Sequence, residues 1–155
     1  KAGEKAAALK AFAVVGPVEG KEVDFTAERK DAPTVYLFVN AEKFDRPLAR
    51  FMRELDMKLG DIDEKAAAVA VWVGGDAEKL KDHLPRVQMS LKLGKTSYAV
   101  SGEAGGPAGW VVNLDAHLTA VVVVGGKVVK SSGFVSVNET DVKGVVEALQ
   151  KAAKK

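Results

Sequence analysis

Few residues of this chain have side chains that could do chemistry. Its 155 residues include no cysteine and two histidines, His83 and His117. Without a cysteine thiol the chain cannot form a disulfide, a thiolate metal site or a thiol nucleophile. Each histidine stands alone in its segment, without the paired spacing that metal ligands need. We therefore assign no catalytic residue, no metal ligand and no cofactor, and we expect His83 at the surface.

A second candidate for chemistry is the sequence Gly94-Lys95-Thr96, which matches the end of a phosphate-binding loop. That motif also requires a glycine where this chain has Met89, and a strand where the sequence before it is typical of a helix. We therefore expect no phosphate site at this loop.

Overall charge and hydropathy exclude some classes of partner. The 23 Lys and Arg residues nearly balance the 21 Asp and Glu residues, which gives a net charge of +2. A mixed surface of this kind does not favour nucleic-acid binding. No apolar run approaches the ~18 to 20 residues of a membrane span, so we expect a soluble protein without membrane insertion. The chain begins at Lys1 rather than Met, which favours loss of an upstream tag or leader and hence export to the periplasm or the exterior.

The first half of the chain predicts strands on either side of a charged turn, followed by a helix. After a first stretch over 11–15, the alternation at residues 23–26 predicts a short edge strand, with a charged turn over 28–33. The uninterrupted apolar run from Thr34 to Val39 is typical of a central strand covered on both faces. A helix should follow, with Asp45 as its cap, Pro47 in its first turn and Gly60 at its end. Its apolar stripe consists of Leu48, Phe51, Met52, Leu55 and Leu59.

In the second half, residues 66–73 predict a buried strand that includes Trp72. Asp76 should cap a helix that Pro85 interrupts, with a separate turn over 87–93 and a short strand over 96–100. Residues 119–124 and 127–130 flank Gly125-Gly126 and predict a tight hairpin of type I′. A last helix should follow the capping segment 138–141, with four apolar residues facing inward: Val142, Val145, Val146 and Leu149.

In this order, strands and helices alternate and then end in an antiparallel hairpin, which predicts a mixed sheet with helices on both faces. We expect a single domain over residues 1–155, with an N-terminal extension over 1–19 and a core over about 20–151.

Over Gly20 to Lys151 the sequence resembles the thioredoxin-like superfamily, and within it the redoxin and peroxiredoxin-type branch. The matching parts are the strand Thr34–Asn40, the helix from Leu48, and the stretch from Leu118 through the hairpin, Gly133-Phe134 and the last helix. The resemblance implies a thioredoxin-like three-layer α/β/α fold with a mixed central sheet and a C-terminal β-hairpin plus helix.

The chemistry of that family is missing at both places where the resemblance would put it. Between strand and helix, where the family has its cysteines, this chain has Phe44-Asp45-Arg46-Pro47. Where the family has a cis proline before the hairpin strand, this chain has Leu118. A non-proline cis bond costs ~3 kcal/mol, so we expect Leu118-Thr119 to be trans.

These departures lead to the hypothesis of a non-catalytic, redox-inactive thioredoxin-like domain that acts as a binding or structural module and not as an enzyme. Its partner would be an unidentified protein or small molecule, or a second copy of the chain in a homodimer. The resemblance gathers the candidate binding surface at the former active site: Phe44, Asp45, Arg46, Pro47, Trp110, His117, Leu118 and Thr119.

An alternative from another class is a non-thiol enzyme or ligand site that uses Asp45, Arg46 and His117 in the same cleft. A helix N-terminus presents unpaired N–H groups that can hold a ligand. This alternative requires the three side chains to converge within hydrogen-bond reach, about 3 Å directly or through one water.

Overall fold

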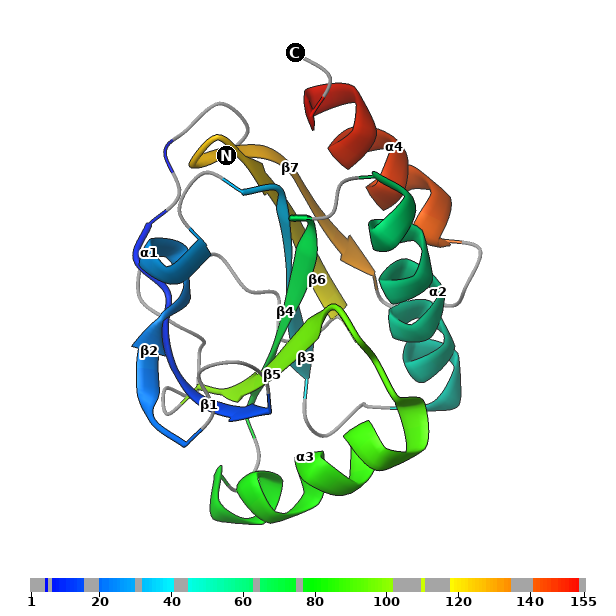
Figure 1. Cartoon of the computed structure of the whole chain (residues 1–155). Coiled ribbons are helices and arrows are strands. Elements are labelled where there is room, and N and C mark those ends of the chain that lie inside the picture. Colours follow the sequence, from blue (N-terminus) through cyan, green and yellow to red (C-terminus); the bar gives the residue numbers. More distant parts are fainter. Residues whose placement is uncertain are drawn as a thin grey trace.

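The computed structural model describes residues 5, 7–15, 20–29, 32–40, 45–62, 65–74, 77–101, 110, 118–134 and 141–153. They form one seven-stranded sheet with helices on both of its faces (Figure 1). The strands are β1 (Lys10–Val15), β2 (Glu22–Asp24), β3 (Thr34–Asn40), β4 (Ala67–Val73), β5 (Thr96–Val100), β6 (Leu118–Val124) and β7 (Lys127–Phe134). The helices are α1 (Phe25–Arg29), α2 (Arg46–Ile62), α3 (Ala77–Leu91) and α4 (Val142–Ala153).

The sheet is mixed, as the alternation of elements predicts. Its strand order is β2-β1-β5-β4-β3-β6-β7, and β3, β4 and β5 are parallel. The strands outside this parallel centre run antiparallel to their neighbours, and β6 pairs with β3 so that Leu118 lies opposite Val39. Because the central strands are covered on both faces, β3 and β4 need no polar alternation.

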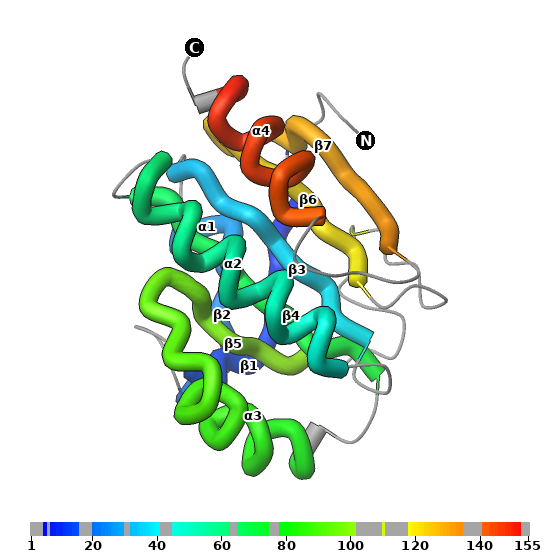
Figure 2. Tube along the Cα trace, turned by 90° about the vertical axis from the view of Figure 1, so that its right-hand side faces the viewer, coloured from blue at the N-terminus to red at the C-terminus, as the bar shows by residue number. Residues whose placement is uncertain are grey.

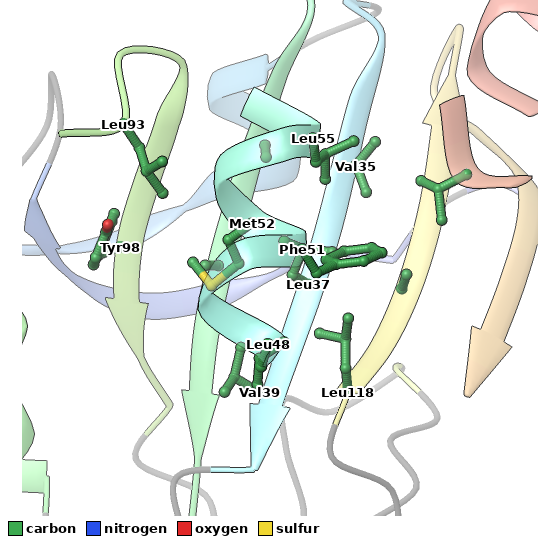
Figure 3. Packing of buried hydrophobic residues seen from close by; sticks show 14 of the residues in the cluster. Val35, Leu37, Val39, Leu48, Phe51, Met52, Leu55, Leu93, Tyr98 and Leu118 are labelled. Carbon is green, nitrogen blue, oxygen red and sulfur yellow. The ribbon is translucent and has the colours of Figure 1, made fainter. Parts of the chain in front are cut away.

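One face of the sheet is covered by α2, α3 and α4, which lie side by side in front of it in Figure 2. The predicted apolar stripe of α2 is confirmed, since all five of its residues are buried against this face. Figure 3 shows four of them, Leu48, Phe51, Met52 and Leu55, packed over β3 and its neighbouring strands. Trp72 and the four inward residues of α4 are buried in the same core, as expected.

The opposite face has its own apolar layer, built around Tyr36 and Phe38 of β3. It is covered by Leu9 before β1, by Phe25 of the short helix α1, and by Trp110. The alternation of side chains along each strand sends odd and even residues of β3 to different faces, which is why two separate cores form.

The β6–β7 hairpin is also confirmed. Gly125 and Gly126 have φ values of +63° and +76°, the conformation that a type I′ turn requires and that only glycine adopts without strain. The strand β7 continues to Phe134, four residues beyond the predicted end at Lys130.

Three expectations about local structure are wrong. Residues 25–29 form α1 instead of the end of a strand and a turn, because the Asp24 carboxylate accepts hydrogen bonds from the Thr26 and Ala27 N–H groups and starts a helix. Gly60 does not end α2, which runs on to Ile62 because Leu59 is buried beside it.

Pro85 does not interrupt the next helix either, and α3 continues through it to Leu91. Burial of Leu84 and Val87 on either side of the proline offsets the hydrogen bond that the proline removes. The Gln88 side chain then closes the helix end by bonding both the N–H and the carbonyl of Leu93. The expected capping residues Asp76 and 138–140 lie outside the described part of the chain.

Candidate functional site

The junction between β3 and α2 is where the resemblance puts the former active site. The strand ends at Asn40 and the helix begins at Arg46, while residues 41–44, including Phe44, lie outside the described residues. Asp45 is the helix cap, as expected: its Oδ1 accepts a 3.0 Å hydrogen bond from the Leu48 N–H, and its backbone carbonyl accepts one from the Ala49 N–H. The carboxylate of Asp45 therefore stabilises the first turn of α2.

Arg46 and Pro47 occupy the first turn of that helix. Arg46 is exposed, and Pro47 is half-buried at a position where its missing N–H costs nothing. The guanidinium of Arg46 adds a full positive charge to the end of the helix that already carries a partial positive charge. Among the described residues of the candidate surface, Arg46 is the most accessible to a partner.

Leu118 is a core residue. It is fully buried (0% exposed) at the start of β6, directly opposite Val39. Figure 3 shows Leu118, Val39 and Leu48 together at the carboxyl end of β3. The described residues include no cis peptide bond, so Leu118-Thr119 is trans, as expected.

Trp110 and Thr119 lie on the other face of the sheet from α2. The Trp110 ring packs 5.1 Å from the ring of Tyr36 and 5.3 Å from that of Phe38, measured between centroids. Its Nε1 donates a 3.0 Å hydrogen bond to the Ala8 carbonyl. Thr119 is buried opposite Phe38. The sheet therefore separates these two residues from Asp45, although the resemblance groups all of them at one site.

The structure describes one of the two histidines. His83 is exposed on α3, as expected. His117 lies outside the described residues, so the convergence of Asp45, Arg46 and His117 that the enzymatic alternative requires stays untested. Of the three residues in this alternative, Asp45 has a structural role in the described geometry, because its carboxylate caps α2.

The loop at Gly94-Lys95-Thr96 is occupied by an internal carboxylate. The N–H groups of Gly94 and Lys95 and the hydroxyl of Thr96 all donate to Asp56 of α2, over 2.8 to 3.0 Å. A bound phosphate would need these same donors, which the Asp56 carboxylate already engages. The sequence contained no signal for this contact, because Asp56 lies on the polar side of its helix.

No protein-family model and no curated protein matches the sequence. Solved structures do match. A candidate thiol:disulfide interchange protein DsbE from Chlorobium tepidum superposes with a TM-score of 0.74 and 14% identity, over 98% of this chain and 97% of that chain. A yeast mitochondrial 1-Cys peroxiredoxin gives a TM-score of 0.68 and 14% identity, over 99% of this chain and 78% of that chain.

A third similar structure is the exposed lipoprotein thioredoxin Etrx1 of Streptococcus pneumoniae. Its TM-score is 0.61 at 12% identity, over 91% of this chain and 98% of that chain. At such low identities the similarity establishes the fold alone. The chain has a thioredoxin-like α/β fold, as the resemblance implies. It contains no cysteine. None of the helices in the described ranges is both long and apolar enough to cross a membrane.

Proposed function

We propose that this chain is a single, redox-inactive thioredoxin-like domain that acts as a binding or structural module and not as an enzyme. The observation that carries the proposal is the role of Asp45. At the strand-to-helix junction, where the resemblance puts a reactive thiol, this chain has a carboxylate that caps α2. Thiol redox chemistry needs the thiol of a cysteine, and the chain contains no cysteine.

The second former active-site position supports the same proposal. Leu118 is fully buried opposite Val39, in the same core cluster as Leu48, so its side chain contributes to the core and cannot contact a substrate directly. Both positions are thus used to stabilise the fold. A domain that keeps this architecture without its chemistry is suited to holding a partner or a neighbouring segment.

For the contact surface we propose the region around Phe44, Asp45, Arg46 and Pro47, together with His117. The resemblance also groups Trp110, Leu118 and Thr119 there, but we leave them out, because Leu118 and Thr119 are buried and Trp110 packs on the opposite face of the sheet. Arg46 is the natural first contact, because it is exposed and carries the charge at this end of α2. Export from the cytoplasm belongs to the same proposal and is supported by the likeness to an exposed lipoprotein thioredoxin.

The absence of thiol redox catalysis is tested with the pure protein in an insulin-reduction assay with dithiothreitol and in a peroxide-consumption assay. A cysteine-containing thioredoxin and a peroxiredoxin serve as positive controls. We expect rates equal to those of buffer in both assays. Turnover above the buffer rate would overturn the proposal.

The structural role of Asp45 is tested with two substitutions. Asp45→Ala should lower the free energy of unfolding by about 1 kcal/mol, whereas Asp45→Asn should be nearly neutral because asparagine caps helices as well as aspartate does. A carboxylate needed for proton transfer would show the opposite pattern, with Asn as damaging as Ala to any activity found. Urea denaturation followed by circular dichroism measures the first effect.

Self-association is tested by light scattering at high protein concentration, with Arg46→Glu and Arg53→Glu as a matched pair. Both arginines are exposed on α2, but only Arg46 lies at the proposed surface. Dissociation of a dimer by Arg46→Glu alone would support this surface as a homodimer interface. A monomer at every concentration would exclude a second copy as the partner.

A further inference from the structure

A cavity of about 770 Å³ lies at the end of the sheet opposite to the α2 N-terminus, where the parallel strands β4 and β5 begin. We call it the amino-end cavity. Its walls come from α1, from the first residues of β4 and β5, from the end of β1 and from the segment that follows α3. Its volume falls within the range of small-molecule sites, roughly 300 to 1,000 Å³.

The inner walls of the amino-end cavity are apolar. Phe25 and Val69 line it from the core layer on the α1 face of the sheet, and Leu93, Ala66 and Ala68 line it from the layer on the α2 face. An apolar lining of this kind favours a ligand with an apolar body, because that body leaves water on binding.

Arg29 of α1 supplies a fixed positive charge to the cavity wall. Its Nε donates to Thr34 Oγ1 over 2.8 Å, and its Nη2 donates to the carbonyl oxygens of Pro33 and Lys65. These bonds use three of the five N–H donors of a guanidinium. The two donors of Nη1 have no hydrogen-bond partner among the described residues.

This arrangement prepares Arg29 for an anion. Burial lowers its pKa, yet an arginine keeps its charge under all ordinary conditions. Because the side chain is already held by three hydrogen bonds, a ligand would not have to order it, and that part of the entropic cost of binding is avoided.

The described residues that line the cavity carry more positive than negative charge. Lys65 and Lys95 line it together with Arg29, and Glu28 is the only carboxylate among these described residues. Lys95 is held against the wall by a 3.1 Å hydrogen bond from its Nζ to the Ala66 carbonyl. Three cations against one anion suit a ligand of low negative charge.

We propose that the amino-end cavity binds a small monocarboxylate, with its apolar body against Phe25 and Val69, on the face of the sheet that α1 covers, and its carboxylate on Nη1 of Arg29. Lys65 and Lys95, which also line the cavity, add a favourable field. Glu28 and the apolar walls disfavour a compact dianion such as inorganic phosphate. The site is independent of the surface proposed around Arg46, which lies at the other end of the sheet.

The test uses 1-naphthoate as the probe, its neutral analogue 1-naphthamide and inorganic phosphate, each titrated into ¹⁵N-labelled protein and followed by NMR. We expect naphthoate to produce saturable shifts at the cavity residues, with naphthamide and phosphate each binding roughly tenfold or more weakly. Equal binding of naphthoate and naphthamide, or no saturable shift with naphthoate, would overturn the proposal.

Variants identify the charge that recognises the probe. Arg29→Gln should weaken naphthoate binding by roughly tenfold, as expected for one lost charge-assisted contact, whereas Arg53→Gln on the exposed side of α2 should leave it unchanged. Since Arg29→Gln also removes hydrogen bonds to the fold, Lys65→Glu provides a second test at an exposed position. It should weaken naphthoate binding in a folded protein. Unchanged affinity in both variants would contradict the assignment.

Discussion

Thr96 Oγ1 donates a 2.8 Å hydrogen bond to Asp56 Oδ1, joining the first residue of β5 to α2 across 40 positions of sequence. The same carboxylate accepts hydrogen bonds from the backbone N–H groups of Gly94 and Lys95. Three donors of one loop thus converge on a single side chain. This contact holds the loop that leads into β5 and that forms one wall of the amino-end cavity.

Replacement of Asp56 should therefore be costly. Asp56→Ala leaves three donors without their acceptor and should lower the free energy of unfolding by about 2 to 3 kcal/mol, measured by urea denaturation. The matched control is Asp61→Ala, an exposed position on the same helix, where we expect a change within about 0.5 kcal/mol. Equal losses in the two variants would show that the Asp56 contacts contribute nothing specific.

The hydroxyl of Tyr98 should be dispensable. It is buried and has no hydrogen-bond partner among the described residues, while the ring stacks on Trp72 with centroids 5.4 Å apart. Tyr98→Phe keeps the stacking and removes an unpaired polar group, so it should raise the free energy of unfolding by about 1 kcal/mol. A clear loss of stability in thermal or urea denaturation would mean that the hydroxyl has a partner.

Stability should fall steeply at alkaline pH. Burial raises the pKa of Tyr36 to about 12, well above the ordinary value of about 10. Between these two values the unfolded chain loses the tyrosine proton while the folded chain retains it, so unfolding becomes easier as pH rises. We expect Tyr36 to contribute a loss of roughly 2 kcal/mol between pH 10 and pH 12.

Urea denaturation at several pH values, compared between the native chain and Tyr36→Phe, isolates that contribution from the other titrating groups. The variant should lose less stability over this pH range, whatever its stability at pH 7. Burial and the nearby Asp56 also raise the pKa of Tyr98, so the double variant should show the shallowest dependence. Parallel curves for the native chain and Tyr36→Phe would contradict the assignment.

The proline inside α3 should limit the stability of that helix. Pro85 is exposed, and it cannot donate a hydrogen bond to the Lys81 carbonyl one turn earlier. Pro85→Ala should raise the free energy of unfolding by about 1 to 3 kcal/mol. Arg86→Ala, at the next exposed position, is the control and should change stability by less than about 0.5 kcal/mol. A loss of stability in Pro85→Ala would mean that the proline ring makes a contact that the helix needs.

Much of the fold could be predicted because the spacing of apolar residues along the chain indicates which side chains are buried. Leu48, Phe51 and Leu55 repeat at helical spacing, and they do face the core. Gly125-Gly126 between two apolar runs predicted the hairpin, since a type I′ turn needs positive φ at both positions. The continuity of α3 through Pro85 could not be predicted, because the burial of Leu84 and Val87 that outweighs the proline is a tertiary effect.

The candidate site shows the same division. The cap at Asp45 could be predicted from residue type and position, since a helix cap is a local hydrogen bond. The role of Arg29 could not be predicted. Its partners Pro33 and Thr34 are local, but its third partner, the Lys65 carbonyl, lies just before β4 and is remote in sequence. The placement of Trp110 on the face opposite to α2 likewise depends on a ring contact with Tyr36 that is distant in sequence.

By itself, then, the sequence determined which chemistry is impossible and which elements form. The lack of cysteine rules out thiol reactions in any conformation, and apolar periodicity is a property of neighbouring residues. Only the tertiary structure decided that Leu118 is buried, that Asp56 and Thr96 meet, and that Arg29 lies on a cavity wall. Those outcomes depend on which strands pair and which faces pack against each other. The contacts that bury a side chain or place it at a site come from residues that are distant in the sequence.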